Sequence, residues 1–124
     1  MKKKTNAQLK KKLWQVFAQF IKLRDRNTCY TCGRRAEGYG IHAGHFIPKS
    51  AGGIALYFHE DNVHAQCAGC NLFLAGNQYE YGKRLGEDKV RELFTLKGQI
   101  TKDFPFTEKI SEYTKKVEEL KKVK

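Results

Sequence analysis

Two Cys-x-x-Cys pairs constrain this chain more than any other feature of its sequence. They are Cys29–Cys32, followed by Gly33, and Cys67–Cys70. A Cys-x-x-Cys turn lets two thiolates bind one ion, and a trailing glycine relieves the tight backbone. Four thiolates are the coordination of a structural zinc, so we expect a closed zinc site that organises the fold and takes no part in a reaction. Four unpaired buried cysteines and a redox dithiol are the alternatives.

The stretch between the two cysteine pairs is much longer than the spacer of a zinc ribbon, which indicates a functional insert. It holds His45 before a loop and Asn62 on the return, and Asn71 directly follows the last cysteine. We expect the zinc clamp to bring these three side chains together. A neutral imidazole can take a proton from water, and an amide oxygen can bind a hard cation such as Mg²⁺. This combination suits metal-assisted hydrolysis of a phosphodiester.

Hydrophobic spacing predicts an α+β fold in one domain of 124 residues. We expect an amphipathic helix over residues 8–25, strands over 41–47 and 54–58 with a flexible loop at 50–53, and helices over 71–81 and 87–100. A last helix opens with Thr107 as its N-cap, and its apolar stripe consists of Ile110, Tyr113, Val117 and Leu120. The domain divides into an N-terminal helix (1–26), a zinc-stapled core (27–84) and C-terminal helices (85–124).

The charge of the chain points to an anionic partner. Lysine and arginine number 24 against 13 acidic residues, a formal net charge of +11, which attracts polyanions such as nucleic acid. A membrane-surface binder and a merely soluble basic protein are the alternatives. No apolar run reaches the roughly 18 residues of a transmembrane span, and Lys10, Lys11 and Lys12 interrupt any secretory signal. We therefore expect a cytosolic protein without a membrane partner, in which paired cysteines favour metal over disulfides.

An ordered series of motifs runs through the chain. It comprises Cys29-x-x-Cys32-Gly33, then Ala43-Gly44-His45, then Asp61-Asn62-x-His64-x-Gln66-Cys67-x-x-Cys70-Asn71, and finally Gly76-Asn77 with Tyr81. On this series the chain resembles the HNH, or ββα-metal, nucleases, and more closely the phage recombination endonucleases of the NinG or Rap family. The resemblance implies a small ββα-metal core, with the four-cysteine zinc site, between the N-terminal and C-terminal helices.

The same resemblance implies roles for individual residues. His45 matches the general base, Asn62 matches the asparagine that holds that base in position, and Asn71 matches a ligand of a catalytic Mg²⁺ or Mn²⁺ ion. One position departs from the pattern: many HNH nucleases carry an acidic metal ligand immediately before the base histidine, and here that residue is Gly44. The ion therefore needs a ligand from elsewhere in the chain.

His64 is the first candidate for the missing ligand, because it lies inside the family's own Asn-x-His-x-Gln-Cys stretch. Asp61 and His42 are the alternatives, although strand alternation directs His42 away from His45. His59 is expected to be a surface turn residue. Residues expected to contact DNA phosphates are the N-terminal lysines, Lys49, Lys83 and Arg84.

Three functions remain open on the sequence. The resemblance implies a metal-dependent endonuclease that cuts branched recombination intermediates such as Holliday junctions or D-loops, in the cytoplasm of a bacterium that carries the phage or prophage. The alternatives are a general HNH endonuclease or nickase on duplex DNA, and a non-catalytic zinc-stabilised module that binds nucleic acid. Symmetric cutting of a four-way junction needs two active sites, so a homodimer is possible, with the last helix or the first as its interface.

Overall fold

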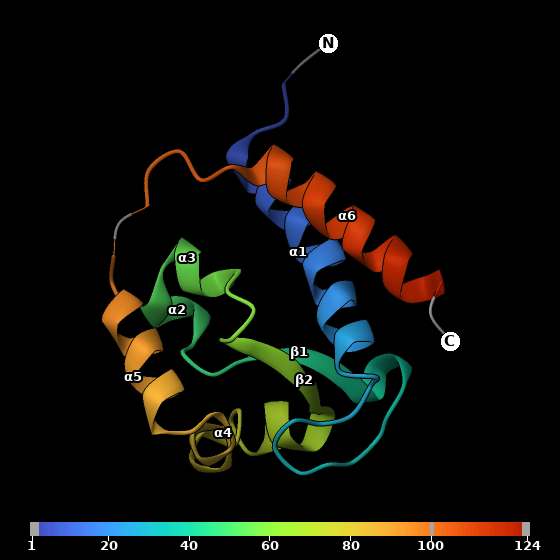
Figure 1. Ribbon diagram of the computed structural model, residues 1–124, viewed down its shortest axis with the longest axis vertical. Coiled ribbons are helices and arrows are strands. Elements are labelled where there is room, and N and C mark those ends of the chain that lie inside the picture. The colour runs from blue at the N-terminus through green and yellow to red at the C-terminus, as the bar shows by residue number, and fades with distance from the viewer. Residues whose placement is uncertain (1–2, 100, 123–124) are drawn as a thin grey trace.

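A two-stranded antiparallel sheet lies at the centre of the computed structural model, which describes residues 3–99 and 101–122 (Figure 1). Strand β1 (Ile41–His45) pairs with β2 (Val63–Cys67), and Gly44 lies opposite His64. Six α-helices are described: α1 (Asn6–Arg24), α2 (Lys49–Gly52), α3 (Ile54–Tyr57), α4 (Gln78–Leu85), α5 (Glu87–Leu96) and α6 (Phe106–Lys122). A 3₁₀ turn, η1 (Gly38–Gly40), precedes β1, and a π-helical turn, η2 (Gly69–Phe73), follows β2. The fold is therefore a mixed α+β fold.

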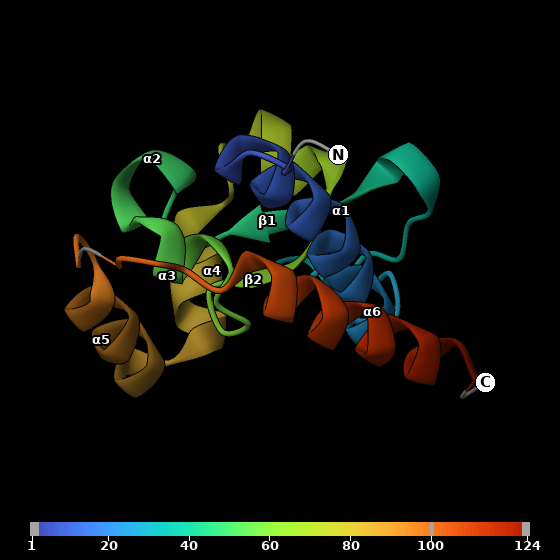
Figure 2. The ribbon, with the colours of Figure 1, turned by 90° about the horizontal axis from the view of Figure 1, so that it is seen from above.

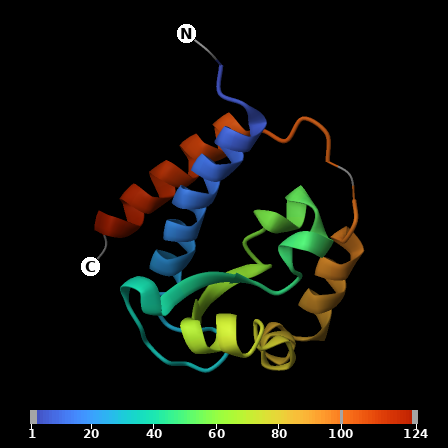
Figure 3. The same ribbon diagram turned by 180° about the vertical axis from the view of Figure 1, so that it is seen from behind.

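The first helix starts at a capping box. The Thr5 hydroxyl accepts a hydrogen bond from the backbone N–H of Gln8 at 3.2 Å, and the Gln8 side chain accepts one from the backbone N–H of Thr5 at 2.9 Å. Helices α1 and α6 lie side by side (Figures 1 and 3). Their apolar faces form one core cluster with residues of the sheet region: Leu13, Phe17, Phe20, Ile21, Phe58, Val63, Tyr113 and Val117.

A second apolar cluster lies on the other side of the hairpin and joins α4 and α5 to the end of β1. Its buried members are Phe46, Ile47, Leu56, Tyr81 and Leu93. Figure 2 shows the hairpin between the α1–α6 pair and the helices α4 and α5. The hairpin is thus packed between two sets of helices, which fixes the segment that joins its two strands.

The predicted strand over 54–58 is wrong, because this segment is helix α3 and the second strand is Val63–Cys67. A short apolar run does not distinguish a strand from a buried helical turn. Leu56 packs into the second cluster, whereas Ile54, Tyr57 and Phe58 contact the first, which is the spacing of a helix. The predicted loop at 50–53 is also mostly helical, since α2 covers Lys49–Gly52.

The helix predicted over 71–81 is interrupted. Asn71 lies inside the π-helical turn η2, and the backbone then takes positive φ angles at Ala75 (+49°), Gly76 (+88°) and Asn77 (+49°) before α4 begins at Gln78. Left-handed residues cannot continue a right-handed helix, so the helix ends there. The first strand is shorter than expected too, because Ile47 bonds to the Asn62 side chain instead of to a partner strand.

The C-terminal helices begin and end at other residues than predicted. Helix α5 ends at Leu96, and Ile100, the predicted end, lies outside the described residues. Helix α6 begins at Phe106, so Thr107 lies in its first turn and is not its N-cap. The stripe around Tyr113 and Val117 packs against α1 within the same chain. None of the helices in the described ranges is long and apolar enough to span a bilayer.

Candidate functional site

The four cysteines converge as the sequence predicts. Their sulfur atoms all lie within 4.8 Å of one another, and the Sγ atoms of Cys32 and Cys67 are 3.7 Å apart. A tetrahedral zinc with Zn–S bonds of about 2.3 Å separates its sulfurs by about 3.8 Å, whereas a disulfide needs about 2.05 Å. The cysteines are free thiols with the spacing of a metal site, and zinc fits it.

Two tight turns bring the thiols into place. In the first, Gly33 has a φ of +80°, and its N–H donates to the carbonyl of Cys29 at 2.9 Å. In the second, the N–H of Cys70 points at the Sγ of Cys67 at 3.5 Å. Because Cys67 ends β2 and Cys70 lies in η2, a metal here ties the sheet to the turn that carries Asn71.

The pKa values of Cys29 and Cys32 are shifted in opposite directions. Burial raises the pKa of Cys29, but hydrogen bonds from the Thr31 hydroxyl and three backbone N–H groups bring it down to about 6. Burial raises the pKa of Cys32 to about 12, and its sulfur faces the other three sulfurs. A divalent cation bound at the cluster would stabilise the thiolate forms of its ligands.

His45, at the end of β1, is held as a neutral imidazole. Its ring is stacked on Trp14 with centroids 5.1 Å apart, and its Nε2 lies 2.9 Å from the carbonyl oxygen of Tyr57. Because a carbonyl only accepts, Nε2 carries the proton and Nδ1 keeps a free lone pair. Burial lowers the pKa of His45 to about 4, with a smaller contribution from Lys49 and against the opposing effect of the Tyr57 carbonyl.

Asn62 is fully buried and fastens the loop between the strands. Its Oδ1 accepts from the N–H of Ile47 at 2.8 Å, and its Nδ2 donates to the carbonyls of Ile47 (3.1 Å) and Leu56 (3.0 Å). Leu56 directly precedes Tyr57, whose carbonyl orients His45. The Asn62 amide thus fixes the Leu56–Tyr57 segment, and the Tyr57 carbonyl in turn orients His45. Asn62 forms no hydrogen bond with the imidazole.

The Asn71 amide is oriented by His42. The Nε2 of His42 lies 3.0 Å from the carbonyl of Tyr39, so it carries the proton, and its Nδ1 accepts from the Asn71 Nδ2 at 2.9 Å. The Oδ1 of Asn71 is therefore turned away from His42. A Cβ atom added to Gly44 would lie 3.0 Å from this oxygen. Asn71 thus faces the position of the side chain that Gly44 lacks.

One open pocket of about 360 Å³ brings His45, Asn71 and Lys49 together. The three residues come from β1, η2 and α2, which lie far apart along the chain. The pocket is lined by His45, Pro48, Lys49, Ser50, Asn71, Ala75, Gly76 and Gln78. Among these described residues Lys49 is the one that carries a charge, and its Nζ lies 4.9 Å from the centre of the Trp14 ring.

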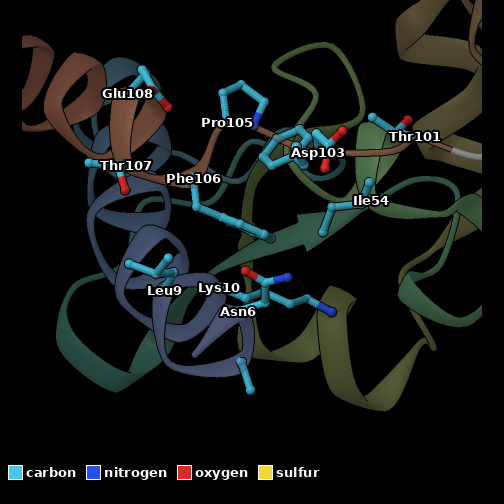
Figure 4. A pocket seen from close by; sticks show the side chains of 12 residues that line it. Asn6, Leu9, Lys10, Ile54, Thr101, Asp103, Pro105, Phe106, Thr107 and Glu108 are labelled. Carbon is cyan, nitrogen blue, oxygen red and sulfur yellow. The ribbon is translucent and has the colours of Figure 1, made fainter. Parts of the chain in front are cut away.

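A larger pocket of about 650 Å³ lies elsewhere (Figure 4). It is formed by the first turns of α1, Ile54 and the segment 101–108. Its described lining contains neither histidine nor cysteine, and its acidic residues Asp103 and Glu108 disfavour a phosphate. The smaller pocket around His45 is therefore the candidate functional site.

His64 does not line this pocket. Its ring is stacked on Tyr30 with centroids 3.8 Å apart, and its Nδ1 lies 3.1 Å from the hydroxyl of Tyr81. That hydroxyl donates to the carbonyl of Gly44 at 2.7 Å, so His64 Nδ1 carries the proton and donates to the Tyr81 oxygen. Burial lowers the pKa of His64 to about 4, as expected for a packed imidazole. His64 packs against Tyr30 and Tyr81 on the face of the hairpin that also carries Gln66.

The remaining predicted residues lie apart from the pocket. Asp61 forms an ion pair with Lys89 at 3.3 Å, and its backbone N–H donates to the ring of His59 in the turn before β2. Lys83 lies over the ring of Tyr79, and Arg84 over the ring of Tyr30. Among Lys49, Lys83 and Arg84, which are predicted to contact phosphates, only Lys49 lines the pocket that His45 and Asn71 share.

Gln66 lies beside the predicted site residues, although the sequence alone does not identify it as one of them. It is fully buried in β2, and its Oε1 has no hydrogen-bond partner among the described residues. The motif contained it, but only the register of the hairpin places it opposite His42 and beside Gly44.

Comparison with known proteins identifies the relatives of this chain. A family model described as "Bacteriophage Lambda NinG protein" matches residues 1–123. The protein ninG of Escherichia phage lambda is 34% identical over 88 residues, which are 67% of this chain and 42% of the lambda protein. The ninG proteins of Escherichia phage 933W and Enterobacteria phage VT2-Sa have the same identity, with 43% of their lengths covered. The chain thus spans less than half the length of these relatives. No solved structure matches it. With nearly all of its residues matched by the family model, the chain belongs to the NinG family of bacteriophage proteins.

Proposed function

We propose that this chain is a metal-dependent DNA endonuclease of the HNH type that hydrolyses phosphodiester bonds in branched recombination intermediates. One observation carries the proposal: a neutral imidazole with a free Nδ1, an oriented amide oxygen and a lysine line the same open pocket. These groups suit the activation of water and the binding of a phosphate with a cation.

His45 is the proposed general base. The Tyr57 carbonyl fixes its tautomer, so that Nδ1 can accept a proton from water. Its pKa of about 4 keeps the imidazole unprotonated at neutral pH. A bound anionic phosphate would favour the imidazolium form of His45 and would therefore raise its pKa. This would allow His45 to accept the proton from water. Asn62 is a positioning residue in this proposal, because it fastens the loop that presents the Tyr57 carbonyl.

Asn71 Oδ1 is the proposed ligand of Mg²⁺ or Mn²⁺. Oxygen ligands suit both hard cations, and the His42–Asn71 hydrogen bond turns this oxygen toward Gly44. When bound, such an ion stabilises negative charge that develops on a phosphate. His64 and Asp61, which are candidate ligands on the sequence, do not line the described pocket. His42, the third candidate, would hold Asn71 in place and would not bind the ion itself.

The arrangement of elements supports an HNH-type core. An antiparallel hairpin carries His45 at the end of its first strand, and the helical turn after the second strand carries Asn71. The cysteine cluster joins the same strand to the same turn, so a zinc there would hold the pocket without reacting.

Two further observations support DNA as the substrate. The net charge of +11 attracts the phosphate backbone, and Lys49 supplies a positive charge inside the pocket. The described pocket lining offers no groove-reading motif, and recognition through backbone and shape suits branched DNA. Cleavage of ordinary duplex DNA is the second candidate, because the same chemistry would serve both.

The test is cleavage of a labelled four-way junction beside a linear duplex built from the same arms. We expect cutting of the junction with Mg²⁺ or Mn²⁺ and none with EDTA. His45→Ala should lower the rate by about 10²–10⁴-fold, the usual contribution of a general base, and should keep zinc and DNA binding.

Three outcomes separate the candidates. Equal cutting of junction and duplex would leave a nuclease without structural specificity. Binding without cutting under any divalent ion would leave a zinc-stabilised DNA-binding module. Undiminished cutting by a folded His45→Ala protein would remove His45 from the mechanism.

A further inference from the structure

Gln66 carries an oxygen that the fold leaves unpaired. Its Nε2 donates to the carbonyl of Gly76 at 2.7 Å and to the hydroxyl of Thr31 at 3.2 Å. Because the Gly76 carbonyl only accepts, the amide nitrogen must lie on that side, and Oε1 must point the other way. Oε1 is buried and has no hydrogen-bond partner among the described residues. A buried acceptor of this kind destabilises the fold unless a bound ligand or an ordered water satisfies it.

The unpaired oxygen points at Gly44. A Cβ atom at Gly44 would lie 1.9 Å from Gln66 Oε1 and 3.0 Å from Asn71 Oδ1. Two amide oxygens therefore converge on the place where an acidic side chain at position 44 would begin. No acidic residue fits there while Gln66 keeps this conformation, which explains why the chain carries glycine.

We propose that Gln66 Oε1 and Asn71 Oδ1 together hold the catalytic divalent cation, so that Gln66 replaces the acidic ligand that is absent at Gly44. The inference rests on the proposed nuclease function for the role of the ion, but it assigns a ligand that the HNH pattern does not contain. Both ligands are hard oxygen donors, as Mg²⁺ and Mn²⁺ prefer.

This ligand pair carries no charge, which makes the cation dependent on DNA. Protein sites for Mg²⁺ usually combine one or two carboxylates with substrate phosphates. Here the described pocket lining contains no carboxylate, Lys49 adds a positive charge, and the whole chain carries +11. The phosphate of the bound DNA must supply the negative charge. Cation and DNA therefore each strengthen the binding of the other by the same factor.

Binding of Mn²⁺, followed by its electron paramagnetic resonance signal, tests this without relying on cleavage. The zinc-loaded His45→Ala protein is titrated with and without a DNA junction, which stays intact in this variant. We expect DNA to strengthen Mn²⁺ binding about tenfold or more, as coupling between two sites commonly does. Gln66→Ala should weaken Mn²⁺ binding to the complex about tenfold, whereas Gln78→Ala, at an exposed glutamine that lines the His45 pocket, should not change it.

A pair of double variants moves the ligand back to position 44. Gly44→Asp with Gln66→Ala should bind Mn²⁺ without DNA, and Gly44→Asn with Gln66→Ala, which differs by one charge, should need DNA. This pair keeps the inference testable if Gln66→Ala alone is too unstable, because both double variants refill the same space.

Three results would overturn the inference. The first is unchanged Mn²⁺ affinity in a folded Gln66→Ala protein. The second is loss of binding in His42→Ala together with ¹⁴N imidazole coupling in the Mn²⁺ spectrum, which would make His42 the ligand. The third is tight Mn²⁺ binding without DNA.

If Mn²⁺ binds as expected but no DNA is cut, the nuclease proposal fails and the cation site stands. If DNA is cut and Gln66→Ala changes nothing, only the inference fails.

Discussion

The cysteine cluster and the His45 pocket differ in how their residues are brought together. The four thiols come from two short turns, and each turn supplies two ligands that are already neighbours in the sequence. The pocket takes His45 from β1, Lys49 from α2 and Asn71 from η2. The first site is largely preformed by local structure. The second exists only when the hairpin, the loop and the turn are all in place.

The two sites are nevertheless coupled along one segment. Cys70 and Asn71 are consecutive residues of η2, and Thr31 links the cluster to the pocket side: its hydroxyl lies 3.3 Å from Cys29 Sγ and accepts from Gln66. Damage to the cluster should therefore reach the pocket, while damage to the pocket should leave the cluster intact. Variants in the cluster and in the pocket should therefore differ in whether they lose zinc.

Loss of a zinc ligand should have the largest effect. Cys67→Ser removes a buried thiol that ends β2, and we expect loss of bound zinc and destabilisation by several kcal/mol, since structural zinc contributes on the order of 10 kcal/mol in small domains. Circular dichroism during thermal unfolding, with zinc content measured in parallel, checks this. Re-addition of zinc to chelated wild-type protein is the control. A Cys67→Ser protein of wild-type stability would mean that the cluster does not organise the fold.

Asn62→Ala should damage the pocket alone. It removes three hydrogen bonds and leaves the Ile47 N–H and two carbonyls without partners, at a cost of about 2–4 kcal/mol. We expect a lower urea midpoint, weaker cleavage and unchanged zinc content. The control is Gln78→Ala, at an exposed glutamine that lines the pocket. Zinc loss in Asn62→Ala would contradict the one-way dependence.

Acid should act through the buried histidines, and each histidine should contribute less than the loss of the zinc site. Burial lowers the pKa of His45 and of His64 to about 4, while an unfolded histidine titrates near 6.5. The unfolded chain therefore binds more protons between these values, and stability falls as the pH drops from about 6.5 to about 4. For His45 the loss is at most about 3 kcal/mol.

Urea unfolding at a series of pH values measures this dependence. Above about pH 6.5 neither histidine should contribute a slope. His45→Ala should flatten the curve between about pH 6.5 and 4, because one of the two titrating groups is gone. An unchanged slope in that variant would show that His45 is not buried as a neutral imidazole in solution.

The members of the cysteine cluster and the class of the fold follow from the sequence. Cys-x-x-Cys spacing is a local property, so the sequence alone identifies the four ligands that the fold brings together. The first helix and the first strand are also predicted from the sequence, with ends within two residues of those in the structure. The segment 54–58 is misassigned from the sequence, since a short apolar run satisfies a strand and a helical turn equally well.

The sequence by itself determined the four thiol ligands, the basic charge, the α+β class and the likeness to the NinG family. Only the tertiary structure decided that His64 packs against Tyr30 and Tyr81 outside the pocket, that His42 orients Asn71, and that Gln66 fills the space beside Gly44. The physical reason is the pairing of β1 with β2. Register and side-chain direction across two strands depend on contacts between distant residues, and no local pattern in the chain specifies them.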